Sequence, residues 1–506
     1  MLAPLNCQPS PQLSTMPNSQ SQLASRHVAV IGAGAGGIVV ARELSREGHR
    51  VVVFERNSQI GGTWVYSPEI ESDPLGVNPD RTRIHSSLYK SLRTNLPREL
   101  MGVRDYPFVP REGEDRDPRR FPGHREVLKY LEDFANEFGI CELVRFRTEV
   151  VFVGLELGKW RIRFRCENGA VDEETFDAVV VCVGNFSLPR VAEIPGIDEW
   201  PGEQMHSHNY RSPEPFRGKV VVVIGYSSSG TDISQELIGV AKEIHIAWKS
   251  AKTELLDTQS SINSVSLHPM IESVHKDGRV VFQDGCIVSV DVILHCTGYA
   301  TVDCFAFSMS AVPLPLFELQ GNWVAGVLSN RIALPSKEEM LADVRAFYAA
   351  LEASGKPKHL THELGDSLPA YMNWLAATCG RPAYEEWRKE MYIATNINRL
   401  ANLESFRDVW HDDELSRQAY EEFSKFTTNE RSQNNSHMNI SSSLTLRSTE
   451  GFLFHLESLP FSAVFMFFGS YHKGTTRSGG YVSNYSTQNR GCCAVLAMKG
   501  FQENCS

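Results

Sequence analysis

The sequence lacks the features by which several large classes of protein are recognised. Among its 506 residues acidic side chains outnumber basic ones, and the formal net charge is -11 at pH 7. Because nucleic-acid binding depends on clustered Lys and Arg, this balance argues against DNA or RNA as a main partner. No run reaches the roughly 18 apolar residues that a membrane span needs. The composition therefore favours a soluble globular protein, which we expect in the cytoplasm.

The eleven cysteines form no C-x-x-C pair and no Cys/His cluster at the spacing of metal ligands. We therefore expect free thiols, no metal site and no redox-active disulfide. The chain also shows no Ser/His/Asp or paired-carboxylate constellation. These gaps fit an enzyme whose chemistry is carried by a bound cofactor.

Residues 27–55 have the pattern of a strand, a glycine-rich turn, a helix and a second strand that ends at Glu55. The turn has the G-x-G-x-x-G spacing. Gly32 would make the tight turn, Gly34 would let a pyrophosphate approach the backbone, and Gly37 would let the helix pack on the strand. Glu55 would accept the ribose hydroxyls and repel a 2′-phosphate. The unit predicts an FAD or NAD site; the alternative is a structural turn beside a surface glutamate.

The sequence Gly-Gly-Thr-Trp follows at residues 61–64. Gly62 and Trp64 would let backbone and an aromatic face meet an extended cofactor. On its own the motif is more often a turn with a buried tryptophan. Its position just after the first turn favours a flavin contact.

The strand–turn–helix–strand pattern recurs over residues 220–249, and we expect its helix at 231–240 and its second strand at 244–248. A further repeat is the pair Asp177-AVVVCV and Asp291-VILHCT, each an acidic residue before an apolar strand. The recurrence predicts an α/β fold of two nested Rossmann-like dinucleotide-binding domains, the second inserted in the first.

The second turn departs from the fingerprint because Ser227 replaces the middle glycine, although Gly225 and Gly230 keep the outer positions. A serine can still admit a phosphate and donate a hydrogen bond to it. Lys249 ends the second strand where the first unit has its acid. A basic group there favours the 2′-phosphate of NADPH. The alternative is a lysine that is simply solvated at a strand end.

Residues 200–210, Trp-Pro-Gly-Glu-Gln-Met-His-Ser-His-Asn-Tyr, lie between the two turns. They resemble the signature F/W-x-G-x-x-x-H-x-x-x-F/Y of the flavin-containing monooxygenases, at the position where that family has it. The first turn, GGTW and the later His-Cys-Thr-Gly-Tyr, which contains Gly298, also match the family. MHSHNY and the later PLFELQ look like the plant branch that S-oxygenates methylthioalkyl glucosinolates.

The resemblance implies an enzyme that uses FAD, NADPH and O₂ to oxygenate a small thioether through a C4a-hydroperoxyflavin. It implies that His206 and Ser207 lie in a segment that shapes the NADPH site, not that His206 is a general base. It aligns Asn95 with an amide that the family places beside the flavin ring, where it donates a hydrogen bond but no acid proton. From the residues alone, Asn95 is a turn residue and His206 a hydrogen-bonding linker residue.

The chain divides into five predicted segments. We expect a disordered leader at 1–25, the first part of the FAD domain at 26–195 and the NADPH domain at 196–295. A helical return to the FAD domain follows at 296–425, and the atypical segment 426–506 is expected to be disordered.

The chain departs from the family at two places. After Tyr299 it runs almost directly into PLFELQ, where family members have a longer stretch with a strand that returns to the flavin end of the first domain. The family's usual ending is also replaced after about residue 425. These departures leave open two alternatives, a catalytically impaired variant that only binds nucleotide and an uncoupled NADPH oxidase.

Overall fold

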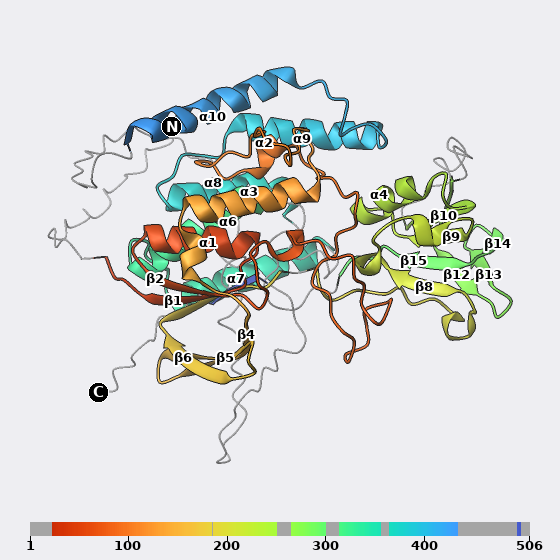
Figure 1. The fold of residues 1–506 in the computed structure, drawn as a ribbon, viewed down its shortest axis with the longest axis horizontal. Coiled ribbons are helices and arrows are strands. Elements are labelled where there is room, and N and C mark those ends of the chain that lie inside the picture. Colours follow the sequence, from red (N-terminus) through yellow and green to blue (C-terminus); the bar gives the residue numbers. More distant parts are fainter. Residues whose placement is uncertain are drawn as a thin grey trace, which may run out of the picture.

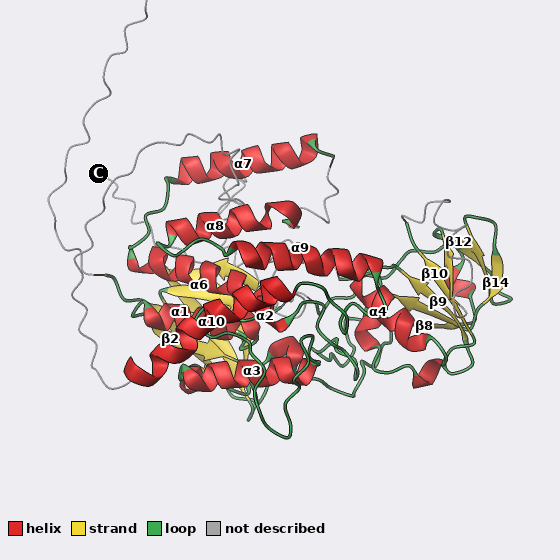
Figure 2. Cartoon of the chain, turned by 90° about the horizontal axis from the view of Figure 1, so that it is seen from above, coloured by secondary structure: helices red, strands yellow, loops and turns green. Residues whose placement is uncertain are grey.

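The computed structural model describes residues 23–184, 186–249, 265–299, 313–355, 364–433 and 493–496. Two α/β lobes lie side by side, each built on a mainly parallel sheet (Figure 1). The chain forms the first sheet, crosses to the second lobe and returns with its later helices to the first (Figures 1 and 2). The predicted α/β architecture of two nested Rossmann-like units is confirmed.

The first sheet has the strand order β16-β7-β1-β2-β3, in which β7, β1, β2 and β3 run parallel. Alternate residues of its central strand face opposite layers. Val28 and Val30 contact the helices, whereas Ala29 faces a three-stranded antiparallel sheet. The elements are β1 (His27–Ile31), α1 (Ala35–Arg46), β2 (Arg50–Phe54), α3 (His124–Glu137), β3 (Val144–Arg145), β4 (Thr148–Glu156), β5 (Lys159–Cys166), β6 (Val171–Phe176) and β7 (Ala178–Cys182).

The second sheet is parallel throughout, in the order β11-β10-β9-β15-β8. Its central strand reads Val-Val-Val-Val-Ile and is buried along its whole length, as expected for a strand covered on both faces. The elements are β8 (Glu203–His206), β9 (Val220–Ile224), α4 (Ser228–Leu237), β10 (Glu243–Ala247), β11 (Val265–His268) and β15 (Val292–His295), with an antiparallel sheet of β12 (Ile271–Val274), β13 (Arg279–Phe282) and β14 (Ile287–Ser289).

Two predicted elements of this lobe have both of their boundaries misplaced, by three residues for the helix and by one for the strand. The helix begins at Ser228 rather than at residue 231, because Ser227 is extended and serves as its N-cap. It ends at Leu237 rather than at residue 240. The following strand covers Glu243–Ala247, one residue earlier than expected.

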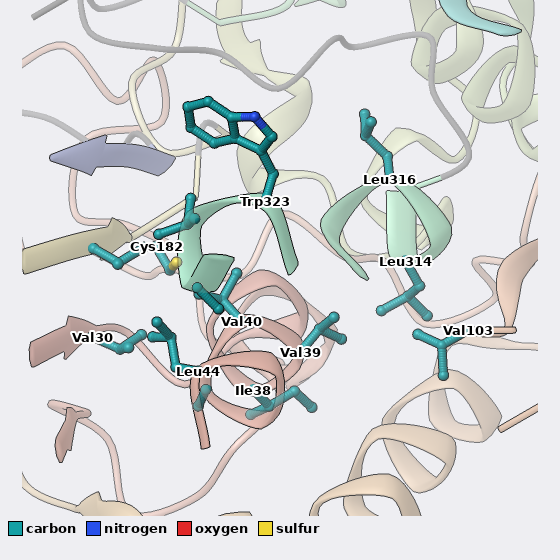
Figure 3. Packing of buried hydrophobic residues seen from close by; sticks show 14 of the residues in the cluster. Val30, Ile38, Val39, Val40, Leu44, Val103, Cys182, Leu314, Leu316 and Trp323 are labelled. Atoms are coloured by element: carbon teal, nitrogen blue, oxygen red, sulfur yellow. The ribbon is translucent and has the colours of Figure 1, made fainter. Parts of the chain in front are cut away.

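The later helices cover the first lobe. Helix α6 packs on α1, with Leu314, Leu316 and Trp323 in one core with Val39 and Val40 (Figure 3). A Cβ on Gly321 would stand 3.2 Å from the Cα of Val40, so the two helices approach as closely as a glycine allows. The helices are α2 (Arg98–Met101), α6 (Pro313–Ser329), α7 (Lys337–Ala353), α8 (Leu368–Thr378), α9 (Glu386–Ala401) and α10 (Asp413–Gln433).

Short 3₁₀ helices connect the main elements, and two of them, η1 and η4, lie at positions singled out in the sequence. The bounds are η1 (Gly62–Trp64), η2 (Ile140–Leu143), η3 (Ile197–Glu199), η4 (Ser207–Asn209), η5 (Glu214–Phe216) and η7 (Gly365–Ser367).

One strand is described within the segment 426–506 that was expected to be disordered. Strand β16 (Cys493–Leu496) pairs antiparallel with β7 at the edge of the first sheet. The open edge of β7 offers backbone donors and acceptors that the short apolar run Cys-Ala-Val-Leu can pair with. Helix α10 also runs eight residues past the expected limit of 425. The leader to residue 22 and the short connection 300–312 lie outside the described residues, and no described helix has the length and apolarity needed to cross a membrane.

Candidate functional site

The first glycine-rich turn, at Gly32–Gly37, admits no side chain at its two ends. Gly32 has φ +97°, and a Cβ there would stand 2.4 Å from the carbonyl oxygen of Cys182. A Cβ on Gly37 would stand 1.9 Å from the carbonyl oxygen of Gly32. The turn therefore folds back on itself between β1 and α1, as the glycine spacing predicts.

The middle glycine of this turn, Gly34, lies beside the GGTW segment. Gly34 is the N-cap of α1 and forms a bridge with Gly61, while Gly62 (φ +56°) begins η1. A Cβ on Gly62 would stand 2.9 Å from the Cα of Gly34. Two bare backbones thus meet at the start of a helix whose first N–H groups have no intrahelical partner. This cradle fits the pyrophosphate of a dinucleotide.

Glu55 is 5 % exposed at the end of β2. One carboxylate oxygen accepts the N–H of Ala33 at 2.8 Å, and the other accepts the N–H of Asn57 at 2.8 Å. The carboxylate therefore fixes the glycine turn itself, a role that the fingerprint alone does not assign. Trp64 is half-buried and packs against the main core of the first lobe.

The second turn repeats this geometry. Gly225 has φ +96°, and its Cβ would stand 2.6 Å from the carbonyl oxygen of Cys296. A Cβ on Gly230 would stand 1.9 Å from the carbonyl oxygen of Gly225. Ser227 makes no side-chain capping bond, so its hydroxyl is available to a phosphate at the start of α4. Lys249 is exposed one residue beyond Trp248, which follows β10.

The two acidic residues of the repeated strand pattern have equivalent contacts. Asp177 accepts the N–H of His27 at 2.8 Å, and Asp291 accepts the N–H of Val220 at 2.8 Å. Each carboxylate thus ties the strand after it to the first residue of the strand before the glycine turn. The repeat seen in the sequence therefore corresponds to the same carboxylate-to-backbone hydrogen bond between strands in both lobes.

The segment 200–210 forms a seam between the lobes. A Cβ on Gly202 would stand 2.2 Å from the buried ring of Trp200, which explains the spacing of these two positions. Tyr210 is buried, and its hydroxyl donates to Glu236 on α4 at 2.7 Å. The segment also supplies the edge strand β8.

His206 is fully buried and neutral. Its Nδ1 accepts the backbone N–H of His208 at 3.0 Å, so Nε2 carries the proton and donates to the carbonyl oxygen of Gly298 at 2.9 Å. Burial lowers the pKa of His206 to about 3. Its neighbour Ser207 is buried and hydrogen-bonds the Cys296 thiol, whose pKa burial raises to about 12. These contacts join the segment to the strand end at residues 296–298.

The same segment also contacts the first lobe. The side chain of Asn209 accepts the N–H of Glu71 at 2.9 Å and donates to the carbonyl oxygen of Pro74 at 3.0 Å. His208 lies 3.4 Å from the Glu71 carboxylate. Burial would raise the pKa of Glu71, but hydrogen bonds from His208 and Arg81 hold it below its usual value. The contacts of His208 and Asn209 with Glu71 and Pro74 therefore hold segment 200–210 against the first part of the chain.

Asn95 lines a cavity of about 290 Å³ that also reaches the start of α4. Its side-chain oxygen accepts a hydrogen bond from Arg407 at 2.6 Å. The cavity thus joins the predicted flavin-side amide to the helix of the second turn. It is lined by Asn95, Ser228, Thr231, Asp232, Gln235, Ile238, Arg399, Leu403, Glu404, Phe406 and Arg407.

Two groups in the structure were not predicted from the sequence. Arg407 was missed because nothing in its local sequence relates it to Asn95, 312 residues earlier. His268, Asp284 and Cys286 were missed as well, because the predicted absence of a Cys/His cluster was read from sequence spacing. Their ligand atoms lie within 4.8 Å of one another. Both nitrogens of His268 are already hydrogen-bonded, to Asp284 and to His245.

Two Rossmann-like lobes, each with a glycine turn that fits a dinucleotide phosphate, are typical of an oxidoreductase that binds two nucleotides. Residues 25–260 match the family model described as flavin-binding monooxygenase-like. The Arabidopsis thaliana flavin-containing monooxygenase FMO GS-OX-like 4 is 52% identical over 452 residues, which is 81% of this chain and 100% of that protein. The chain belongs to the flavin-containing monooxygenase family.

Solved structures agree with this assignment. The S-allyl-L-cysteine S-oxygenase from Allium sativum is 50% identical, with a TM-score of 0.77 over 80% of this chain and 100% of that chain. Tmm from Pelagibacter sp., at 22% identity and a TM-score of 0.63, shares the fold. The predicted NADPH- and FAD-dependent monooxygenase is thereby confirmed, whereas the roles of the individual site residues stay predictions.

Proposed function

We propose that this enzyme transfers one oxygen atom of O₂ to the sulfur of a small thioether. One NADPH is oxidised, the thioether becomes a sulfoxide, and the second oxygen atom leaves as water. The observation that carries the proposal is the cavity that joins Asn95 to the start of α4, the helix of the second turn. The 50% identity to an S-oxygenase and the similar identities to relatives named GS-OX support sulfur as the acceptor.

In this proposal the protein's own residues bind and orient the cofactors and the substrate and shield them from water. Reduced FAD supplies the activated oxygen. The turn at Gly32, Gly34 and Gly37 holds the FAD pyrophosphate, with Gly62 and Trp64 alongside it and Glu55 at the ribose.

The second turn holds NADPH. Gly225, Ser227 and Gly230 cradle its phosphates, and Lys249 faces its 2′-phosphate. His206, Ser207 and Gly298 fix the crossing between the lobes. Burial lowers the pKa of His206 to about 3 and keeps its ring uncharged at neutral pH. It therefore acts as a hydrogen-bond donor in the frame of the site and takes no part in proton transfer.

Asn95 is proposed to donate from its amide NH₂ to an oxygen of the flavin or of NADP⁺. An amide is neutral and a poor acid, so Asn95 would donate a hydrogen bond to the bound cofactor without protonating it. That property separates transfer of oxygen to sulfur from wasteful release of H₂O₂.

The finer proposal is that the substrate is a methylthioalkyl glucosinolate, which becomes the methylsulfinylalkyl product. The resemblance of MHSHNY and PLFELQ to the glucosinolate S-oxygenases favours this class. The garlic relative is named for S-allyl-L-cysteine, a thioether with a different polar part. We place the enzyme in the cytosol, where the six cysteines recorded as free thiols in the described part of the chain would stay reduced.

Purified protein tests the proposal directly. We expect a yellow holoenzyme that consumes NADPH faster with methylthioalkyl glucosinolate than without it, and one sulfoxide for each NADPH. S-allyl-L-cysteine and a tertiary amine serve as comparison substrates. Colourless protein that binds nucleotide without turnover would support the impaired variant instead. NADPH use matched only by H₂O₂ would support the oxidase.

A further inference from the structure

Arg407 is held between the two lobes by three hydrogen-bonding partners. Its Nε donates to the carbonyl oxygen of Thr94 at 3.0 Å, and Nη2 donates to the Asn95 Oδ1 at 2.6 Å. Its Nη1 lies 2.7 Å from the carboxylate of Asp232 on α4. The Arg407 side chain is only 15% exposed, so these contacts are shielded from water. The three nitrogens of the guanidinium therefore each contact a different residue.

This contact determines which way the Asn95 amide faces. A guanidinium carries five N–H donors and no acceptor, so the atom of Asn95 that meets Arg407 must be its oxygen. The NH₂ group then remains as the part of the amide that can donate to another molecule in the cavity. The reverse orientation would set donor against donor and lose a charge-assisted hydrogen bond.

The connection that carries Arg407 is itself held against the same segment of the first lobe. Arg93 makes two parallel hydrogen bonds to the carboxylate of Asp408, at 2.8 and 2.9 Å. The guanidinium of Arg407 stacks on the buried ring of Phe406, with its central carbon 4.7 Å from the ring centre. These contacts restrict the rotamers of Arg407, so its fork is fixed before any ligand arrives.

Asp232 links this arrangement to the NADPH turn. It lies on α4, the helix that begins at the second glycine turn, and it accepts a hydrogen bond from Tyr89, which packs in the core of the second lobe. A shift of α4 on nucleotide binding would therefore act through Asp232 on Arg407, and through Arg407 on Asn95.

We propose that Arg407 is a positioning residue, which holds the Asn95 amide with its NH₂ group free to donate and ties it to the NADPH-binding helix through Asp232. The proposal rests on the proposed function of Asn95. It adds a residue from the far end of the chain to the site and a route by which nucleotide occupancy reaches the flavin-side amide.

The test compares Arg407→Lys with the holoenzyme. A lysine keeps the charge, but its single ammonium cannot serve Thr94, Asn95 and Asp232 in their present directions. We expect FAD retention and melting temperature close to those of the wild type, with the fraction of NADPH that yields sulfoxide reduced about 3- to 10-fold. Binding of NADP⁺ to the oxidised holoenzyme, measured by calorimetry, should weaken by a similar factor, which corresponds to about 1 kcal/mol. Arg417→Lys, at an exposed arginine of α10, is the matched control.

A double-mutant cycle shows whether Arg407 acts through Asn95. In an Asn95→Ala background, Arg407→Lys should cause no further loss of coupling, which is the fraction of the consumed NADPH that yields sulfoxide. Additive losses, or a lowered melting temperature with coupling unchanged, would overturn the positioning role. Asp232→Asn, which keeps the Arg407–Asn95 contact, should weaken NADP⁺ binding more than it lowers coupling. It also tests the link to α4 if the lysine variant does not fold.

Failure of this inference is distinguishable from failure of the proposed function. If Asn95→Ala lowers coupling and Arg407→Lys does not, only the inference about Arg407 is wrong. If Asn95→Ala couples as the wild type does, the proposed role of Asn95 is wrong, and the inference that rests on it falls too.

Discussion

Gly37 faces the carbonyl oxygen of Gly32 so closely that a Cβ would stand 1.9 Å from it, whereas a Cβ on Gly34 would stand 3.5 Å from the Cα of Gly62. The first spacing is impossible for a side chain and the second is an ordinary van der Waals contact. Steric exclusion therefore explains the glycine at position 37 but not the one at position 34. Gly37 is required by the protein's own packing, whereas Gly34 has room for a Cβ, and we propose that its glycine serves the space that a ligand needs.

We accordingly expect Gly34→Ala to fold and Gly37→Ala to be severely destabilised. The Gly34→Ala protein should keep the far-ultraviolet circular dichroism of the wild type and a melting temperature within a few degrees of wild-type apoprotein. It should lose most of its bound FAD, because the added methyl group occupies the phosphate cradle. The absorbance ratio at 450 and 280 nm measures this. A Gly34→Ala protein with full FAD content would contradict the proposed pyrophosphate site.

The same turn shows how far sequence reasoning reaches. The fingerprint is local, so the strand, the turn, the helix and Glu55 could be predicted from about 30 consecutive residues, and both lobes follow from its repetition. The repeat of an acidic residue before an apolar strand is also structural, because Asp177 and Asp291 make equivalent hydrogen bonds in the two lobes. The predicted start of α4 is three residues late. Ser227 is extended and is the N-cap of the helix, but it stands where the fingerprint has a glycine, so the sequence pattern does not mark it as a cap.

Contacts between distant parts of the chain could not be predicted. Arg407 meets Asn95 across 312 residues, and no periodicity or spacing encodes that pairing. The signature at 200–210 was recognised, but its physical content, Gly202 beneath the Trp200 ring and Tyr210 bonded to Glu236, needed the folded chain. The pairing of β16 with β7 was missed for the same reason, since an edge strand is defined by its partner.

Lys249 provides a test of nucleotide choice. The Lys249→Ala variant should show a KM for NADPH raised about tenfold, which corresponds to about 1.4 kcal/mol of lost contact with the 2′-phosphate. The KM for NADH should stay within twofold, because NADH lacks that phosphate. Lys242→Ala, at another exposed lysine of the same lobe, is the control. If the KM rises equally for both nucleotides, or for neither, Lys249 does not contact the 2′-phosphate.

Glu55 should stabilise both the folded turn and the bound FAD. In Glu55→Gln one carboxylate oxygen becomes an NH₂ group, which must face the N–H of Ala33 or that of Asn57. A buried donor left without an acceptor costs about 1–3 kcal/mol. We expect a lower melting temperature in the apoprotein and weaker FAD retention after gel filtration. The exposed Glu69→Gln serves as control, and equal behaviour of the two variants would argue against this role.

His206 links stability to pH, with a sign that follows from its burial. Its pKa is lowered to about 3 in the folded protein and lies near 6.5 in an unfolded chain, so below pH 6.5 the unfolded state binds the extra proton. The folded protein therefore loses stability as the pH falls from 6.5 toward 3, by at most about 1.4 kcal/mol for each pH unit. At pH 7.5 His206 is unprotonated in both the folded and the unfolded state, so this loss of stability is absent.

The variant His206→Gln isolates the effect, because glutamine can donate to the Gly298 carbonyl oxygen and does not titrate. Its melting temperature at pH 7.5 should be below that of the wild type, since the ring fits its cavity better than an amide does. Its further drop on going to pH 5.5 should be smaller than the wild-type drop. Differential scanning calorimetry at the two pH values measures both, with the exposed His275→Gln as control. A variant whose melting temperature falls as steeply as that of the wild type would show that His206 does not carry the acid sensitivity.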